Sequence, residues 1–406
     1  MAHVSRDNPF PGLRPFEFED RAFFFGRKSH LLELHRKLVT NRFVAVVGAS
    51  GSGKSSLVKA GLLGLLHDEW ERRSGPAWRV LLLRPQGDPI HELARQLAVA
   101  KAQAGGDHPD ADQQTALELA RAESRLQHSS LGLSELLDEL VSEKGGRVLL
   151  VIDQFEELFR YPYAAAITHG SHAAGLDQRT LFVKHLLEAS EAHGRPFHLL
   201  ITMRSEFLGD CTEFRGLPEV INDSQFLTPR LTRDQRRETI VGPIEMAGGS
   251  IAPALVQRLL NDVGNEPDQL PVLQHALMRT WVAAAPGRHL ELSHYETAGR
   301  MERSISDHAN NIYAALEPPL QSLAERVFKS LTDVDREGRE TRRPCRFSRL
   351  IAETGASTRD VQAVIDPFRA PDCAFIVPTG PTVLTADTVV DISHEALMLS
   401  FPPGRR

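Results

Sequence analysis

An apolar run leads directly into a glycine-rich loop near the start of the chain, and this junction constrains the fold more than any other feature. Residues 43–47 are Phe-Val-Ala-Val-Val, Gly48–Ser55 has the pattern Gly-x4-Gly-Lys-Ser, and residues 57–63 are Leu-Val-Lys-Ala-Gly-Leu-Leu. A buried strand, a tight turn and a helix in this order predict an α/β sheet with the loop at a strand's carboxyl end. The alternative is a chance match of the glycine pattern, which the apolar segments on both sides disfavour.

The loop has the composition of a triphosphate-binding site. Glycines let consecutive backbone N–H groups point at phosphate oxygens, and the helix that follows adds the positive end of its dipole. Lys54 is expected to reach the β- and γ-phosphates, and the Ser55 hydroxyl to ligate Mg²⁺. The sequence therefore predicts a site for ATP or ADP with Mg²⁺. The loop residues expected to bind nucleotide are Gly48, Ser50, Gly51, Ser52, Gly53, Lys54, Ser55 and Ser56.

A second apolar run ends in acidic residues. Residues 148–152 are too uniformly apolar for a half-exposed strand and predict a central parallel strand, buried on both faces. Asp153 follows at the carboxyl end, where doubly wound sheets bind ligands, and is the expected Mg²⁺ residue. Glu156 or Glu157 is expected to orient the attacking water, and the spacing does not choose between them. The alternative for each glutamate is an acidic first turn of the next helix.

Two further strands, residues 78–83 and 196–202, are expected to complete the sheet because both are short, apolar and bounded by polar or turn residues. Arg204 follows the second of them and is expected one strand over from Asp153, where a cation can sense or stabilise the γ-phosphate. The alternative is a surface arginine at a strand end.

Length and composition limit the number of domains and the classes of partner. A chain of 406 residues is too long for one core and suits two or three domains. A net charge of -6 and 41% hydrophobic residues imply no general affinity for nucleic acid or anionic membrane. No apolar run is long enough to span a membrane, and no signal-peptide core opens the chain, so we expect a cytoplasmic protein without a membrane partner.

The segments around the predicted sheet differ in character. Six phenylalanines lie within the first 25 residues, and this aromatic arm could cover the adenine or act as a hydrophobic clasp. Residues 232–315 carry apolar stripes at helical spacing and no convincing strand, which predicts a helical domain. From Leu320 onward, a helix at 323–331, an arginine-rich loop at 336–346, two short helices and two strand-like stretches at 374–377 and 388–392 suit a winged helix.

Winged helices often bind DNA, so the charge of the candidate recognition helix at residues 357–369 decides whether DNA is an expected partner. It carries two arginines against two aspartates, and Pro367 would kink or end it. A phosphate-binding face usually shows a basic excess. Arg339, Arg342 and Arg343 could contact a DNA backbone, but a solvated charged loop is the favoured interpretation. Nucleic acid is therefore not an expected partner.

Seven ordered segments together resemble the novel STAND NTPase family, AAA-like bacterial signal-transduction ATPases with numerous domains. The resemblance covers almost the whole chain. The segments are residues 8–16, 25–27, 48–55, 153–157, 202–204, 270–277 and 393–397.

The resemblance implies an α/β P-loop NTPase, with a parallel sheet flanked by helices, followed by a helical domain and a winged-helix domain. Phe25, Gly26 and Arg27 correspond to a nucleotide-base contact segment, and Pro271 to a helical-domain proline that packs on the base. The alternative for Pro271 is an ordinary helix-start proline. His394 resembles a winged-helix histidine that contacts the β-phosphate and holds a closed state, the alternative being a histidine that starts a core helix.

The expected boundaries are 1–28 for the aromatic arm and base-contact segment, 29–231 for the P-loop α/β domain, 232–315 for the helical domain and 316–406 for the winged helix. Pro402 and Pro403 are expected to cut short the helix after His394, so the last domain is expected to be truncated. We expect no output or sensor domain beside these four parts, and therefore expect a sensor or effector that acts in trans as the partner.

These features together predict a STAND-type regulatory ATPase in bacterial signalling or antiviral defence. ADP is expected to favour a closed form by contacting Lys54, Ser55 and His394. ATP is expected to favour an open, self-associating form, because its γ-phosphate would engage Arg204 and the Mg²⁺ held by Asp153. Two alternatives remain: an ATP-dependent DNA-binding protein of the initiator or transposition-helper type, and a scaffold that holds ATP or ADP without hydrolysis.

Overall fold

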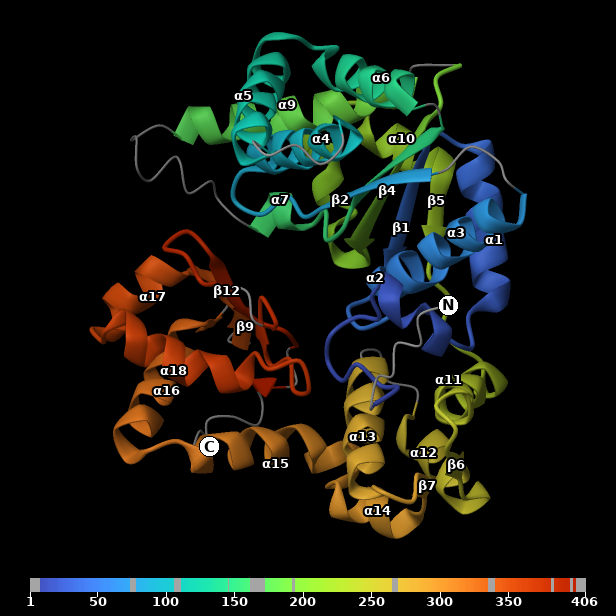
Figure 1. Cartoon of the computed structure of the whole chain (residues 1–406), viewed down its shortest axis with the longest axis vertical. Coiled ribbons are helices and arrows are strands. Elements are labelled where there is room, and N and C mark those ends of the chain that lie inside the picture. The colour runs from blue at the N-terminus through green and yellow to red at the C-terminus, as the bar shows by residue number, and fades with distance from the viewer. Residues whose placement is uncertain are drawn as a thin grey trace. The chain divides into compact units, whose positions relative to one another are not determined.

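The chain forms two compact units, one with a single main hydrophobic core and the other with two. The computed structural model describes residues 8–73, 78–105, 111–144, 146–160, 172–191, 194–264, 269–334, 340–380, 383–394 and 397–398. Arg27–Arg230 form one unit, called here the sheet unit, while Met1–Gly26 and Leu231–Arg406 form the second unit. Figure 1 shows the elements of both units along the chain. No helix within the described ranges is long and apolar enough to cross a membrane.

The sheet unit is built on a five-stranded parallel sheet in the order β2-β3-β4-β1-β5. The P-loop α/β fold predicted from the sequence is confirmed, because four apolar runs form strands at the expected positions and β3 lies between β2 and β4 with five of its six residues buried. The strands are β1 (Phe43–Gly48), β2 (Trp78–Leu83), β3 (Arg147–Ile152), β4 (Phe197–Arg204) and β5 (Gln225–Leu227).

The prediction that four strands complete the sheet is wrong, because β5 pairs with the free side of β1. Val46 lies opposite Phe226 in this parallel pair, and Thr228 N–H then donates to the Val47 carbonyl at 2.7 Å. Only Phe226 of the three β5 residues is buried, while Leu227 is exposed. A three-residue strand with one buried side chain has too little hydrophobic periodicity to be recognised in sequence.

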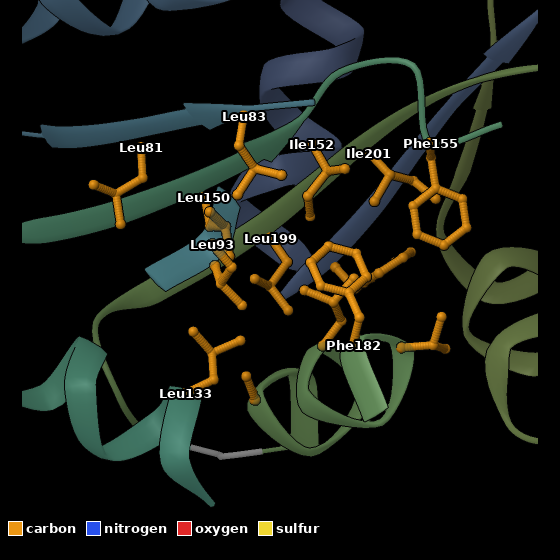
Figure 2. Close-up of a cluster of buried hydrophobic side chains, with 14 of the residues drawn as sticks. Leu81, Leu83, Leu93, Leu133, Leu150, Ile152, Phe155, Phe182, Leu199 and Ile201 are labelled. Carbon is orange, nitrogen blue, oxygen red and sulfur yellow. The ribbon is translucent and has the colours of Figure 1, made fainter. Parts of the chain in front are cut away.

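Helices cover both faces of this sheet (Figure 1). On one face, α4, α6 and α9 bury a cluster of leucine, isoleucine and phenylalanine side chains against alternate residues of β2, β3 and β4 (Figure 2). Leu150 and Leu199 belong to this face, and Phe182 of α9 is fully buried among them. The helices of the unit are α1 (Lys28–Thr40), α2 (Lys54–Ser56), α3 (Leu63–Arg73), α4 (Pro89–Gly105), α5 (Ala111–His128), α6 (Gly132–Lys144), α7 (Glu157–Arg160), α9 (His172–Glu191) and α10 (Leu217–Ser224), with short 3₁₀ turns η3 (Ser205–Phe207) and η4 (Asp210–Glu213).

The helix after the glycine-rich loop is not a regular α-helix. Between α2 and α3 lies a π-helical segment, η2 (Leu57–Leu62), whose six residues are all buried. π-Helical turns are rare and are found mostly at functional sites. The most unusual member is Lys59, because a lysine is almost never buried without a partner.

The first part of the second unit joins the aromatic arm to a set of helices. Phe10 is buried in the same core as residues of α11, α12 and α13, and the Asn8 amide donates to the Met278 carbonyl at 3.1 Å. A parallel pair of two-residue strands, β6 (Ser250–Ile251) and β7 (His289–Leu290), corrects the expectation of no strand here. The helices are η1 (Phe18–Phe23), α11 (Arg233–Met246), α12 (Pro253–Asp262), α13 (Gln269–Ala283), α14 (Leu292–Thr297) and α15 (Arg300–Ala315).

The remainder of the second unit has a separate core beneath α16 (Pro318–Ser330), α17 (Phe347–Thr354) and α18 (Thr358–Phe368). The expected arginine-rich loop is wrong for residues 340–346, which contribute β9 (Glu340–Arg342) to a hairpin with β8 (Thr332–Val334), and β10 (Cys345–Arg346) to a three-stranded sheet in the order β10-β12-β11. Its other strands are β11 (Ile376–Val377) and β12 (Val389–Ile392). Arg339, Pro402 and Pro403 lie outside the described residues.

Candidate nucleotide and magnesium site

The glycine-rich loop joins β1 to α2 at the carboxyl edge of the sheet. Gly51 and Gly53 have φ angles of 63° and 87°, in the left-handed region that favours glycine. Gly48 is closely packed, because a Cβ there would lie 2.9 Å from Ser52 Oγ and 3.1 Å from Thr228 Cβ, so that a side chain would require these neighbours to shift. The glycines of the predicted motif are therefore required by backbone conformation and by close packing.

Lys54 begins α2 and is buried, with its ammonium folded back over the loop. Its Nζ donates to the carbonyl oxygens of Gly48 at 2.8 Å and Ala49 at 2.7 Å. Burial lowers its pKa, although the nearby carboxylate of Glu156 acts in the opposite direction. An ammonium that has given up its hydration gains from any anion brought to it. The loop thus presents a desolvated cation at the position predicted to bind phosphate.

Asp153 directly follows β3 and is 1% exposed. Its Oδ1 accepts two short hydrogen bonds, from Ser55 Oγ at 2.7 Å and from Thr202 Oγ1 at 2.7 Å. Its Oδ2 lies 3.4 Å from Lys59 Nζ and 3.6 Å from Arg84 Nη2. The structure therefore joins the predicted loop serine to the predicted strand-end aspartate.

The charge state of Asp153 follows from these contacts. Burial alone would raise its pKa, but the charges of Lys59 and Arg84, with the hydrogen bonds from Thr202 and Ser55, hold the pKa well below its usual range. The carboxylate is ionised at neutral pH. Among the described residues, none donates a hydrogen bond to the buried Oδ2.

This donor set fits a magnesium ion. Mg²⁺ prefers oxygen ligands and usually keeps several waters, so it needs a hydroxyl or carboxylate and an acceptor for its water shell. Ser55 Oγ and the ionised Asp153 supply hard oxygen atoms at one place, and the buried Asp153 Oδ2 accepts no hydrogen bond from the described part of the chain. Ser55 and Asp153 are the residues that would hold the ion.

The two candidate glutamates face different neighbours. Glu156 is buried beside Arg204, whose backbone N–H lies 3.3 Å from Glu156 Oε2 and whose Nε lies 3.5 Å from Oε1. Glu157 begins α7, and its Oε2 accepts a hydrogen bond from Gln86 N–H at 3.0 Å. Burial raises the pKa of both, that of Glu157 to about 7, although the charges of Arg204 and Lys54 oppose the rise at Glu156.

Arg204 ends β4, which lies between β3 and β1, and pairs in register with Gly48. This places it one strand over from Asp153, as expected, and next to the start of the glycine-rich loop. The Arg204 side chain and Glu156 both contribute to the electrostatic environment of Lys54. Lys54, Glu156 and Arg204 therefore form one charged group beside the loop.

The base-contact segment predicted at residues 25–27 is divided between the units. Phe25 and Gly26 belong to the second unit, where the Phe25 ring lies against Gly242 of α11. Arg27 belongs to the sheet unit and is buried, with guanidinium hydrogen bonds to the carbonyls of Ser52 at 2.8 Å and Pro229 at 2.6 Å. Arg27 thus holds the loop backbone directly.

The remaining predicted residues are placed as follows. Ser50 and Ser52 lie half-buried in the loop, and Ser56 lies in α2. Pro271 occupies the first turn of α13, and His394 lies two residues beyond β12, both in the second unit. Their expected contacts with nucleotide stay predictions.

Three residues of this site were missed by sequence reasoning: Thr202, Lys59 and Arg84. Each could have been suspected. Thr202 is a polar residue at the end of an apolar strand, Lys59 is a charge inside an apolar helix, and Arg84 directly follows β2 at the edge that carries Asp153. For Thr202 and Arg84, the shared signal is a position at the carboxyl edge of a parallel sheet.

Comparison with known proteins gives a family. The model described as Novel STAND NTPase 1 matches residues 9–403. Among curated proteins, none matches the chain in sequence. Similar solved structures include the Aeropyrum pernix ORC1 protein in complex with DNA, at 13% identity and a TM-score of 0.45 over 92% of this chain and 91% of that one.

Two other structures are similar to the same degree. The Walker-type ATPase of Pyrococcus abyssi is 15% identical, with a TM-score of 0.44 over 96% of this chain and 98% of that one. The Aeropyrum pernix ORC2 protein with ADPNP and ADP is 14% identical, with a TM-score of 0.47 over 90% and 89%. Structural likeness of this degree supports no inference about ligands or partners.

Proposed function

The chain belongs to the Novel STAND NTPase 1 family, and from this premise we propose that it is a regulatory switch that binds ATP and ADP and hydrolyses ATP slowly. The observation that carries the proposal is the 2.7 Å hydrogen bond from Ser55 Oγ to Asp153 Oδ1, beside the Lys54 ammonium. A phosphate-loop hydroxyl joined to a strand-end carboxylate is the arrangement that a triphosphatase needs for Mg²⁺.

In this proposal Lys54 exchanges its two carbonyl partners for phosphate oxygens when a nucleotide binds. The exchange is favourable because the carbonyls are neutral, whereas phosphate oxygens carry charge and form stronger hydrogen bonds with an ammonium. Bound Mg²⁺ would neutralise phosphate charge and polarise the phosphoryl group. Ser55 and Asp153 would hold the ion in place.

We assign the water-positioning role to Glu156 rather than Glu157. Glu156 shares its surroundings with Lys54 and Arg204, whereas Glu157 is bound to the backbone of the β2–α4 loop at Gln86. Arg204 can then serve two states, pairing with Glu156 at 3.5 Å as seen here and turning to a γ-phosphate when ATP is bound. Release of Glu156 by that turn would couple ATP binding to hydrolysis.

The switch itself is a shift between populations. ADP would favour a closed form in which His394 contacts its β-phosphate, and ATP an open form that self-associates. To convert a mostly closed population into a mostly open one, the two nucleotides must discriminate between the forms by about 5.5 kcal/mol. Several charge-assisted contacts to a γ-phosphate could supply this. A sensor or effector acting in trans would connect the switch to signalling or defence.

Several arginines in the described part of the last core are paired with acids: Arg342 with Asp391 at 3.0 Å, and Arg343 and Arg349 with Glu353 at 2.8 Å and 2.7 Å. These ion pairs offset the positive charge that the three arginines would present to a DNA backbone, and binding of DNA depends on such charge. We therefore do not propose DNA binding, and the experiment that follows includes duplex DNA to detect it.

The experiment measures ATP hydrolysis and oligomer size together on the full chain. Wild type is compared with Lys54→Ala and Asp153→Ala, and with Lys101→Ala and Asp138→Ala as controls that remove the same charges from ion pairs elsewhere in the sheet unit. Slow hydrolysis that both site variants lose and both controls keep, with assembly that depends on ATP and not on duplex DNA, is the expected result.

Other outcomes would replace the proposal. Binding of ATP or ADP without any hydrolysis of ATP by wild type would indicate a scaffold. Hydrolysis that duplex DNA stimulates, with an affinity for DNA that falls steeply with salt, would indicate an ATP-dependent DNA-binding protein. His394→Ala tests the closed form separately, and unchanged ADP affinity and unchanged assembly in this variant would remove His394 from the switch.

A further inference from the structure

Lys59 has no role in the predicted motif, yet it lies at the centre of the site. It is fully enclosed in η2, with a side chain only 7% exposed, and its Nζ lies 3.4 Å from Asp153 Oδ2. Lys59 is the fourth residue after Ser55, so both side chains project from the same face of the helix. One helix face therefore contacts both oxygens of the Asp153 carboxylate, Ser55 at Oδ1 and Lys59 at Oδ2.

The contact places a counter-charge beside Asp153. In a P-loop site without metal, a strand-end carboxylate repels the phosphates that Lys54 attracts. Here a buried ammonium faces that carboxylate, and Arg84 adds a second cation 3.6 Å from the same oxygen. The repulsion is cancelled by the chain itself.

Cations and carboxyl groups both surround the glycine-rich loop. In the described residues, Lys54, Lys59, Arg84 and Arg204 are set against the carboxyl groups of Asp153, Glu156, Glu157 and Glu206. The cations therefore match the carboxyl groups in number before any metal binds. The same ammonium that helps an anion bind disfavours a divalent cation beside Asp153, because like charges in a water-poor site repel strongly.

Resting on the proposed nucleotide binding, we propose that Lys59 is a built-in counter-ion of Asp153 that lets the site retain ADP without magnesium. Nucleotide binding and metal binding are then only loosely coupled. Lys59 is a positioning residue in this scheme, since it acts on the nucleotide and the ion through Asp153. The consequence for a switch is that loss of the metal does not by itself release ADP.

The test measures the affinity of the full chain for a fluorescent ADP analogue in excess Mg²⁺ and in EDTA. The decisive quantity is the ratio of the dissociation constant in EDTA to that in Mg²⁺. Lys59→Met keeps the length of the side chain but removes its charge, and we expect it to raise this ratio by about tenfold or more, by weakening metal-free binding and strengthening Mg²⁺ binding. Lys59→Arg should keep the wild-type ratio.

Three further variants test whether the effect belongs to the charge pair of Lys59 and Asp153. Lys101→Met removes a paired lysine elsewhere in the sheet unit and should leave the ratio unchanged. Arg84→Gln should raise the ratio less than Lys59→Met, because Arg84 is more exposed. In an Asp153→Asn background, Lys59→Met should lose most of its effect, because its partner is then uncharged.

The results separate this inference from the proposed function. Wild type that binds no ADP in Mg²⁺ would refute the proposed function. Wild type that binds ADP in Mg²⁺ but releases it fully in EDTA would overturn the inference alone, and this result needs no variant to fold. An unchanged ratio in Lys59→Met, or an equal rise in Lys59→Met and Lys59→Arg, would overturn it too.

Discussion

Removal of the Thr202 hydroxyl tests the polar network around Asp153 without touching a predicted ligand. Thr202 is 1% exposed near the end of β4. Its Oγ1 donates to Asp153 Oδ1 at 2.7 Å and accepts from the Gln154 backbone N–H at 3.0 Å. Valine has the same shape but can do neither, so Thr202→Val deletes two hydrogen bonds and leaves the packing almost unchanged.

The expected cost follows from the type of each bond. A hydrogen bond to a charged group contributes about 1.5–3 kcal/mol, and an unmade bond to a backbone amide adds about 1 kcal/mol. Thr202→Val should therefore lower the unfolding free energy of the sheet unit by about 2.5–4 kcal/mol. This is a large share of the ~5–15 kcal/mol that holds a typical domain together.

Hydrogen exchange of the backbone amides in β1, β3 and β4 is the suitable assay. Because the chain has two units, one denaturation curve would mix their unfolding, whereas exchange of these central strands reports the sheet unit alone. Thr202→Ser is the matched control, since it keeps the hydroxyl and loses only a methyl group, and it should cost about 1 kcal/mol.

Two results would refute the reasoning. The first is a Thr202→Val variant within about 0.5 kcal/mol of wild type, which is the size of an ordinary surface substitution. The second is an equal loss in the serine and valine variants, which would assign the effect to the methyl group. In an Asp153→Asn background the cost of Thr202→Val should shrink, because the acceptor is then neutral.

Three further predictions test other parts of the sheet unit. Gly48→Ala should weaken ADP binding by at least about tenfold in a fluorescence titration, because its Cβ would lie 2.9 Å from Ser52 Oγ; unchanged affinity would contradict the tight loop. Phe182→Ala should cost about 3–5 kcal/mol by exchange of the β3 amides, since the ring is fully buried, and a cost below 1 kcal/mol would contradict the core shown in Figure 2. Burial raises the pKa of Glu157 to about 7 in the fold, so the folded protein binds the carboxyl proton more tightly and its unfolding free energy falls as pH rises from about 4.5 to 7. Glu157→Gln should lose this pH dependence and be more stable than wild type by up to about 3 kcal/mol above pH 7. Parallel plots of unfolding free energy against pH for the two proteins would contradict burial as the cause.

The sheet was predictable from sequence because its inner strands must be apolar on both faces. Residues 43–47 and 148–152, in the inner strands β1 and β3, are uninterrupted apolar runs, and a parallel strand covered by helices on both sides requires this composition. The edge strand β5 had no such signal, since it buries one side chain of three. Its pairing with β1 depends on backbone hydrogen bonds, which any residue type can make.

The arginine-rich stretch shows a second limit of sequence reasoning. Charged residues at 340–346 favour a loop by composition, yet they form β9 and β10. Arg342 is held there by Asp391 at 3.0 Å, and the partner lies 49 residues away along the chain. Strands of two or three residues owe their existence to partners of this kind, so local patterns cannot reveal them.

The choice between Glu156 and Glu157 could not be made from spacing because it depends on the strands beside β3. Gln154 has a φ of 59°, which turns the chain sharply after Asp153, and its N–H is fixed by Thr202 of β4. The turn directs Glu156 toward the β4 side, where Arg204 lies, and Glu157 toward the β2 side, where Gln86 lies. Parallel register decides which charged groups stand at each side, since Ile152 pairs with both Leu83 and Ile201. The neighbours of each glutamate are thus set by residues about 50 to 70 positions away, and only the folded sheet brings one of them to Lys54.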